Sequence, residues 1–452
     1  MKNAWYLAIF LIPLVMNPWG MQLYGSGKIF WFFGMVGLFL VGVFFSRWAD
    51  LRRFALKFHR GIYLYLGLWV VSFLLSTVFS LAPVRSFFGE YSLMQGSLFY
   101  IFLAAHFLIC LALFSDKNLQ RLFFWLVKWI GAVAAIAAIL LWTAPEYSNR
   151  LFGASGQPNF LAQFLIFPLF IVLFDVFGKS GRMKKKVRGR IADFVVMVLL
   201  AAVIFLTGSR AVEIGIGFSL WLMFVLIWNG KAIYKLLITV GLIVVVIAGL
   251  WNFGLEMRSL NLRFFLWKGA AQSLNSENIW MGSGVETFYR QFAAVMPKEV
   301  FENEQFYRVP ESPHNEFLEA LTERGIFGAA LYLIPLGFLL MLVWKKEDRR
   351  KFLGIKTLEV YLALVAYYVA VQFSFSVMEH WVYLAAFWAV LLLKVVKFRN
   401  FEIGKVRIVA LPVGVFAIIF AVFYLRMDIL LARGMSVFIE DDAAYGYFDD
   451  AA

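Results

Sequence analysis

Cysteine, histidine and charge are all scarce in this sequence of 452 residues. The single cysteine, Cys110, lies in an apolar run, so neither an intrachain disulfide nor a thiolate metal cluster can form. No Walker loop, dinucleotide fingerprint, zinc-ligand spacing or Asp-x-Asp pair occurs. We therefore expect neither a metal ion nor another cofactor.

Apolar residues take the place of what is missing. The chain is 62% hydrophobic and 19% aromatic, with a mean hydropathy of +0.79. Soluble domains are closer to half apolar. This composition is typical of a polytopic helical membrane protein. The net charge of +14 does not indicate a nucleic-acid partner, because membrane proteins collect basic residues on one face.

The apolar residues divide into thirteen segments, most of them near the length that crosses the hydrocarbon core of a bilayer. The segments lie near 4–18, 28–46, 61–82, 97–114, 123–143, 158–178, 192–207, 211–228, 233–252, 326–344, 357–377, 380–396 and 406–425. The predicted fold is therefore all-α, a transmembrane bundle of 12 to 13 helices whose membrane-spanning part covers residues 1–425.

The distribution of charged residues predicts how the bundle is oriented in the membrane. With the N-terminus in the cytoplasm, most of the 42 basic residues fall on the cytoplasmic face and most of the 28 acidic residues on the other. This orientation requires two helices within 192–228, with a tight turn at Thr207-Gly208-Ser209-Arg210. It makes the long polar loop at about 253–325, the active-site region and the C-terminus extracytoplasmic. The loop is long enough to contain short helices of its own.

Three basic residues on the extracytoplasmic face form the candidate site. His314 precedes a helix that begins near Glu316, and a neutral imidazole there is a suitable general base. Arg210 follows the tight turn, and Arg263 lies in the long loop. Taken alone, Arg210 has the alternative of an interfacial cation, and Arg263 alone is better explained as a membrane-surface anchor. As a pair with a base, they are suited to binding a pyrophosphate.

Other polar residues on the same face are candidates for substrate contacts. They are Gln157, Asn159, Asn315, Lys268, Glu379 and His380. The alternative for Gln157 and Asn159 is a simple helix-start loop around Pro158. His59 and His106 are expected to be solvated and packed, respectively.

Four stretches together resemble the O-antigen ligase/polymerase superfamily of integral membrane glycosyltransferases. They follow the family's order: Gly153 to Ala162, with its Pro-Asn pair; Leu206 to Ala211; Arg263 through Trp267 to Phe288; and Pro313 through Glu323 to Gly328. The departures are Ala211, where the family usually has glycine, and a thirteenth apolar segment.

The resemblance implies an activity and its location. It implies a multi-pass protein of the bacterial cytoplasmic membrane that transfers a glycan from an undecaprenyl-pyrophosphate donor to an acceptor hydroxyl, as a metal-independent inverting enzyme. Arg210 and Arg263 would bind the pyrophosphate, and His314 would activate the acceptor. Besides membrane lipids, the expected partners are this donor and a glycan, lipid or protein acceptor.

Several alternatives stay open. The acceptor distinguishes an O-antigen ligase from a polymerase or a protein O-oligosaccharyltransferase, and the sequence does not choose firmly among them. A lipid or glycan transporter is a different class, but it would need charged residues within the spans. Residues 426–452 form an expected extracytoplasmic tail, whose end resembles the start of a tetratricopeptide-type helix.

Overall fold

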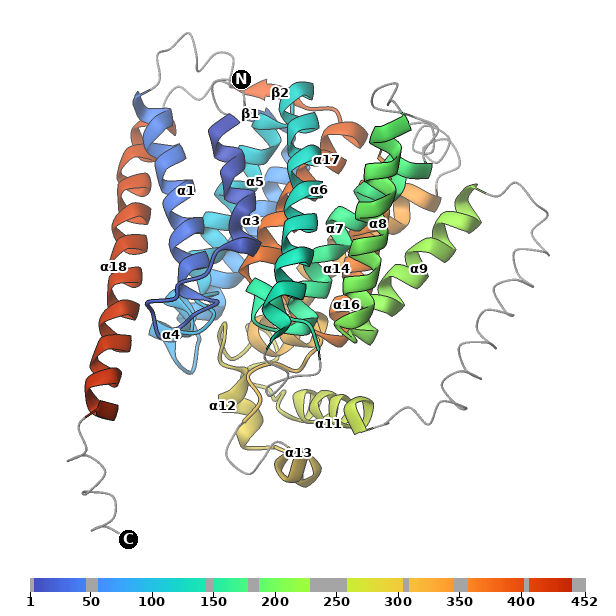
Figure 1. Ribbon diagram of the computed structural model, residues 1–452. Coiled ribbons are helices and arrows are strands. Elements are labelled where there is room, and N and C mark those ends of the chain that lie inside the picture. The colour runs from blue at the N-terminus through green and yellow to red at the C-terminus, as the bar shows by residue number, and fades with distance from the viewer. Residues whose placement is uncertain are drawn as a thin grey trace.

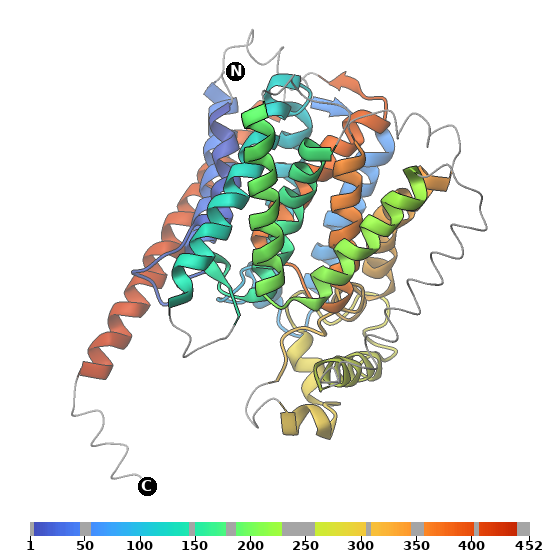
Figure 2. The same cartoon turned by 45° about the vertical axis from the view of Figure 1, so that its right-hand side comes forward.

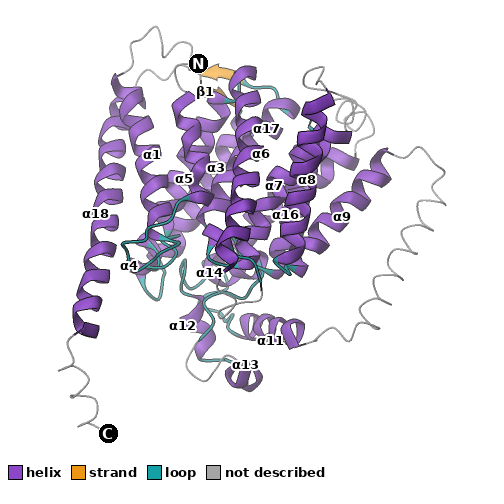
Figure 3. Ribbon diagram, viewed as in Figure 1, coloured by secondary structure: helices purple, strands orange, loops and turns teal. Residues whose placement is uncertain are grey.

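The computed structural model describes residues 4–45, 56–143, 150–177, 187–227, 258–303, 309–344, 357–401 and 406–440. Helices make up most of these residues, as Figure 3 shows. The longer ones are α1 (Ser26–Phe45), α3 (Arg60–Val78), α5 (Ser97–Leu113), α6 (Lys117–Leu140), α7 (Pro158–Phe177), α8 (Val187–Leu206), α9 (Arg210–Ile227), α11 (Arg258–Gln272), α14 (Glu316–Trp344), α16 (Leu358–Ala370), α17 (Met378–Val395) and α18 (Val406–Glu440).

The predicted bundle is confirmed. Within the described ranges, nine helices are long and apolar enough to cross a membrane, namely α1, α3, α6, α7, α8, α9, α14, α17 and α18. Three shorter apolar helices occupy further expected segments: the 3₁₀ helix η1 (Ala4–Leu14), α5, and α16 with its 3₁₀ extension η4 (Val371–Phe373). The remaining expected segment, 233–252, lies outside the described residues.

The two ends of the bundle differ (Figure 1). At one end, which we call the far end, β1 (Leu56–Phe58) pairs antiparallel with β2 (Arg399–Phe401). At the other end lies a layer formed by residues 258–303 and 309–315, which we call the loop layer. Short elements at this end are α4 (Pro83–Phe88), η2 (Leu141–Thr143), η3 (Gly153–Ser155), α12 (Phe288–Ala293) and α13 (Lys298–Asn303).

The predicted turn between the seventh and eighth segments is present. Helix α8 ends at Leu206 and α9 begins at Arg210. Gly208 has a φ of +59°, a left-handed conformation that glycine adopts without steric cost. The chain therefore reverses at the loop-layer end, as the charge pattern requires.

Helix α18 packs along the outside of the bundle against α1, as Figures 1 and 2 show. Their backbones approach closely at Gly37 and Gly414, a contact that favours association of helices in lipid. Beyond residue 425 the helix continues to Glu440, and buried Asp428 accepts hydrogen bonds from Asn17 Nδ2 (2.9 Å) and the Gln22 amide (3.0 Å). The expected tail therefore begins within a continuous helix, and the tetratricopeptide-like residues lie outside the described part of the chain.

The loop layer has a small core of its own, as the length of the loop predicts. Leu266 and Ala270 of α11 pack with Phe288 and Phe292 of α12 and with Val300 of α13. Because this core lies outside the bundle, it gives α11 a fixed position across the end of the membrane helices (Figure 1).

A break in α14 joins the loop layer to the bundle. Gly325 has a φ of +65° and interrupts the helix. The interruption frees two carbonyl groups, which accept loop-layer amides instead: Thr322 accepts from Ser283 (3.0 Å) and Glu323 from Gly284 (3.1 Å). The Ile326 amide in turn donates to Ile279 (2.9 Å). This exchange satisfies backbone groups that would otherwise be buried without partners.

Candidate functional site

His314 lies in the loop layer immediately before α14. Its φ is +51°, a left-handed conformation that costs free energy in a residue with a side chain. Neighbouring contacts hold it there: its amide donates to Ser312 Oγ (3.2 Å), and its ring packs on Phe375 with 5.3 Å between centroids. The backbone therefore orients the imidazole, and α14 begins at Glu316 as the sequence predicted.

The His314 ring is neutral near pH 7. Burial lowers its pKa, and the nearby Arg263 guanidinium lowers it further, to about 4. Burial and the charge of Arg263 are therefore the causes of the neutral ring. A neutral imidazole can accept a proton, as a general base must.

Three arginines gather beside this histidine, and we call them the cationic cluster: Arg150, Arg210 and Arg263. Burial lowers the pKa of Arg263, and the charges of Arg150 and Arg210 lower it further. Burial and the charge of Arg210 lower the pKa of Arg150. These mutual effects place the three guanidinium groups within electrostatic range of one another. The structure thus brings Arg210, Arg263 and His314 together from three distant parts of the chain.

Among the described residues, no carboxylate pairs with Arg210 or Arg263. In the described part of the chain, neither side chain makes a hydrogen bond or an ion pair with another residue. Arg210 is exposed and Arg263 is half-buried. Three like charges held together raise the free energy of the folded protein unless an anion binds between them. The arrangement is therefore suited to a multiply charged anion.

Sequence reasoning missed Arg150. Its Nε donates to the Thr207 carbonyl (2.6 Å), and its terminal nitrogen donates to the Gly208 carbonyl and to Asn159 Oδ1 (both 3.2 Å). It therefore ties the start of α7 to the α8–α9 turn. The signal was available, because Arg150, like Arg210, is a basic residue on the face that the charge pattern makes acidic.

The lesser candidates fall into different positions. Asn159 contacts Arg150, and Gln157 Oε1 is buried without a hydrogen-bond partner among the described residues. The Asn315 side chain makes hydrogen bonds to backbone groups instead: its Nδ2 donates to the Gln372 carbonyl, and its Oδ1 accepts from the Leu318 amide (both 2.9 Å). Lys268 is exposed on α11.

Glu379 and His380 are fully buried at the start of α17. Glu379 pairs with Lys28 of α1. His380 accepts the Val377 amide at Nδ1 (3.1 Å) and donates from Nε2 to the Phe160 carbonyl (2.9 Å). The Phe160 ring packs on Phe375, the same ring that supports His314. In this structure the pair therefore lies behind the Phe160 and Phe375 rings, which support His314.

A carboxylate-lined pocket of about 30 Å³ borders the histidine on another side. Ser312 and Phe375, which contact His314, line it together with Glu319 and Glu323 of α14. Ser312 Oγ donates to Glu319 Oε2 (2.8 Å). Ser312 and Phe375 thus connect His314 to this carboxylate-lined pocket.

Comparisons with known proteins agree with the sequence motifs. The O-Antigen ligase family (Wzy_C) matches residues 195–333, which include Arg210, Arg263 and His314. A Rickettsia bellii (strain RML369-C) protein named "Putative polysaccharide ligase" is 26% identical over 227 residues, 46% of this chain. The match covers 53% of that relative, so this chain spans about half the length of the curated protein it resembles. No solved structure matches. Residues 195–333 of this membrane protein are thus similar to the O-Antigen ligase family.

Proposed function

We propose that this protein is an inverting glycosyltransferase that moves a glycan from an undecaprenyl-pyrophosphate donor to an acceptor hydroxyl. The observation that carries the proposal is the cationic cluster beside a neutral histidine. Within the described part of the chain, Arg210 and Arg263 have no anionic partner, and the His314 ring can accept a proton.

The proposed reaction is a single displacement. The acceptor oxygen attacks the anomeric carbon as His314 Nε2 or Nδ1 takes the hydroxyl proton. The bond from this carbon to the pyrophosphate oxygen breaks, and the leaving group departs with the electron pair. Arg150, Arg210 and Arg263 stabilise the charge that develops on it. Since the arginines supply the positive charge, the proposed reaction needs no metal ion.

The proposed location follows from the charge pattern. The loop layer and the site face the extracytoplasmic side of the bacterial cytoplasmic membrane, and the N-terminus lies in the cytoplasm. The lipid-linked donor reaches the site from within the membrane, and the acceptor reaches it from the aqueous side.

The test is transfer by the purified protein in the presence of a chelator. The donor is a glycan on undecaprenyl pyrophosphate, and the acceptors are lipid A core, a second glycan and a serine-containing peptide. The wild type should transfer to one of them. His314→Ala should lower kcat by about 10²- to 10⁴-fold, the usual contribution of a general base.

Arg210→Gln should lower kcat by about 10²- to 10³-fold, the usual effect of removing one group that stabilises developing charge. Arg290→Gln is the matched control, since Arg290 is an exposed loop-layer arginine outside the cationic cluster. Full transfer by His314→Ala, or a chelator-sensitive wild type, would contradict the proposed mechanism.

A further inference from the structure

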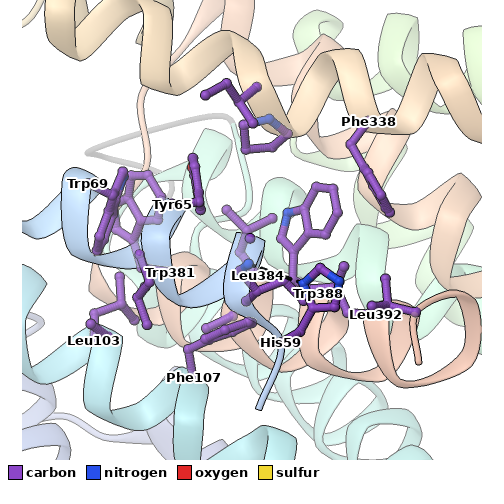
Figure 4. A pocket seen from close by; sticks show the side chains of 18 of the residues that line it. His59, Tyr65, Trp69, Leu103, Phe107, Phe338, Trp381, Leu384, Trp388 and Leu392 are labelled. Atoms are coloured by element: carbon purple, nitrogen blue, oxygen red, sulfur yellow. Dashed lines mark hydrogen bonds between the residues drawn. The ribbon is translucent and has the colours of Figure 1, made fainter. Parts of the chain in front are cut away.

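A second cavity, of about 320 Å³, lies between α3, α5, α14, α16 and α17 (Figure 4). Its walls are almost wholly apolar, and the aromatic rings of Trp69, Phe338, Trp381 and Trp388 form much of them. None of the residues in the cationic cluster lines it, and neither does His314. The cavity is therefore separate from the candidate site.

The cavity is long and opens to the membrane. On α17 its lining runs from Trp381, in the first turn, to Leu392, about 16 Å along the helix axis, and it continues to Val396 just beyond the helix. Ile334 of α14 lines the cavity and is 51% exposed. Because α14 is a membrane-spanning helix, this opening faces lipid. An elongated apolar space that opens sideways suits an extended hydrocarbon chain.

A proline of α14 lies in the wall of the cavity. Pro335 lines the cavity and has no amide hydrogen to donate to the Leu331 carbonyl. Tyr65 Oη of α3 donates to that carbonyl instead (3.3 Å). Tyr65 therefore joins α3 to α14 at Leu331 and satisfies a backbone group freed in the membrane. The lining residues Pro335 and Phe338 lie farther along α14, toward the far end.

The far end of the cavity has a basic rim. His59 and Val396 line the cavity there, and both adjoin the two-stranded sheet. The strand register places Phe58 opposite Arg399, which brings the segments 56–62 and 394–400 together. These segments contain Lys57, Arg60, Lys394, Lys397 and Arg399, and neither contains an acidic residue. At this end of the cavity, the described residues of the two segments thus contribute several basic side chains.

We propose that this cavity binds an acyl chain of an anionic phospholipid, whose headgroup phosphate is held by the basic rim. A basic pocket between membrane helices attracts anionic headgroups, and the apolar cavity buries the chain that comes with them. The isoprenoid chain of a polyprenyl donor is the competing occupant, but such a donor would have its phosphate at the loop layer, at the opposite end. The proposal does not depend on the transferase activity.

The test is native mass spectrometry of the full-length protein titrated with phosphatidylglycerol, phosphatidylcholine or undecaprenyl phosphate. The wild type should retain phosphatidylglycerol in preference to the other two. Ala385→Phe, which fills the cavity, should abolish this binding. Ala104→Leu is a smaller filling change at another lining position and should weaken it. Ala202→Phe is the matched control, because Ala202 is exposed on α8.

Substitutions in the basic rim test the proposed headgroup site without changing the apolar lining of the cavity. The double variant Arg60→Gln/Arg399→Gln should weaken phosphatidylglycerol binding about 30-fold, the factor expected for two charges near a headgroup. Arg190→Gln, an exposed arginine at the start of α8, should leave it unchanged. The proposal is overturned if the filled or rim variants bind phosphatidylglycerol like the wild type. It is also overturned if phosphatidylcholine or undecaprenyl phosphate binds at least as tightly.

Discussion

His314 shows how its surroundings determine what a single side chain can do. The sequence offers four histidines, and the structure gives each different partners. His380 uses both ring nitrogens in hydrogen bonds within the fold, and His59 accepts an amide at the start of α3. His314 keeps a neutral ring between a cationic surface and an aromatic support. His314 combines a lowered pKa with a position beside the cationic cluster.

The link between Arg263 and His314 predicts a pH dependence. Because Arg263 lowers the pKa of His314, Arg263→Gln should raise that pKa toward its ordinary value, although burial still holds it down. Wild-type kcat should stay constant as the pH falls to about 5 and decline toward the pKa of about 4. In the variant the decline should begin at a higher pH. The pH–rate profile measures this, and an unshifted acid limb would contradict the coupling.

Two substitutions of Arg150 should separate the effect of its charge from the effect of its hydrogen bonds on donor binding. Arg150→Ala removes a charge and three hydrogen bonds, and it should weaken donor binding about 10- to 100-fold. Arg150→Lys keeps the charge but cannot span Thr207, Gly208 and Asn159 together. It should recover donor binding only in part. The KM for the donor and kcat, measured separately, distinguish the cases, and full recovery by lysine would show that charge alone matters.

At the scale of elements, helix α14, which is interrupted at Gly325, connects the candidate site to the membrane-spanning bundle. Its first turns carry Glu316, Glu319 and Glu323, whose side chains are largely buried, and its later turns span the bilayer. The break at Gly325 lets loop-layer amides bond to the freed carbonyls. Two of the stretches that resemble the family, one containing Gly284 and the other Gly325, are thus joined by backbone hydrogen bonds.

The junction between α14 and the loop layer predicts the effect of adding a single methyl group at Gly325. Gly325→Ala would place Cβ against the backbone of Trp280 and Met281 at a φ that disfavours alanine. It should lower the free energy of unfolding by about 2 kcal/mol or more, since the strain and the overlap add. Gly337→Ala in the same helix is the control, because an added Cβ there meets open space. Thermal unfolding in detergent should separate the two, and equal melting temperatures would refute the account of the junction.

At the scale of the whole molecule, the two ends have different chemistry. The loop-layer end carries the cationic cluster and His314, and the far end carries the basic rim around an apolar cavity. The proposed function requires the first end to be open to water. The second end then contacts the opposite leaflet, where anionic lipids would meet it.

The orientation can be tested with the single cysteine of the chain. Cys110 is fully buried, so the wild type should react little with a membrane-impermeant maleimide. Ser276→Cys in the loop layer should react in intact spheroplasts, because Ser276 is exposed and predicted to be extracytoplasmic. Ser115→Cys, exposed between α5 and α6, should react only after the membrane is permeabilised. The reverse pattern would invert the predicted topology.

Much of the fold was predictable because its determinants are local. Apolar runs long enough to cross a bilayer located the helices, and Gly208 located the turn between α8 and α9. The candidate site was predictable in part, because His314, Arg210 and Arg263 lie on the face that should have few basic residues. Arg150 was overlooked, and nothing in the sequence shows that Asn315, Glu379 and His380 have partners within the fold.

The sequence by itself determined that the chain is a bundle of membrane helices with a structured loop, since hydropathy and charge act segment by segment. Only the tertiary structure decided which polar groups meet. The pairing of α14 with the loop layer, the burial that keeps His314 neutral and the grouping of Arg150 with Arg210 and Arg263 all join residues far apart in the chain. Such contacts depend on the packing of the whole bundle, and no local pattern encodes them.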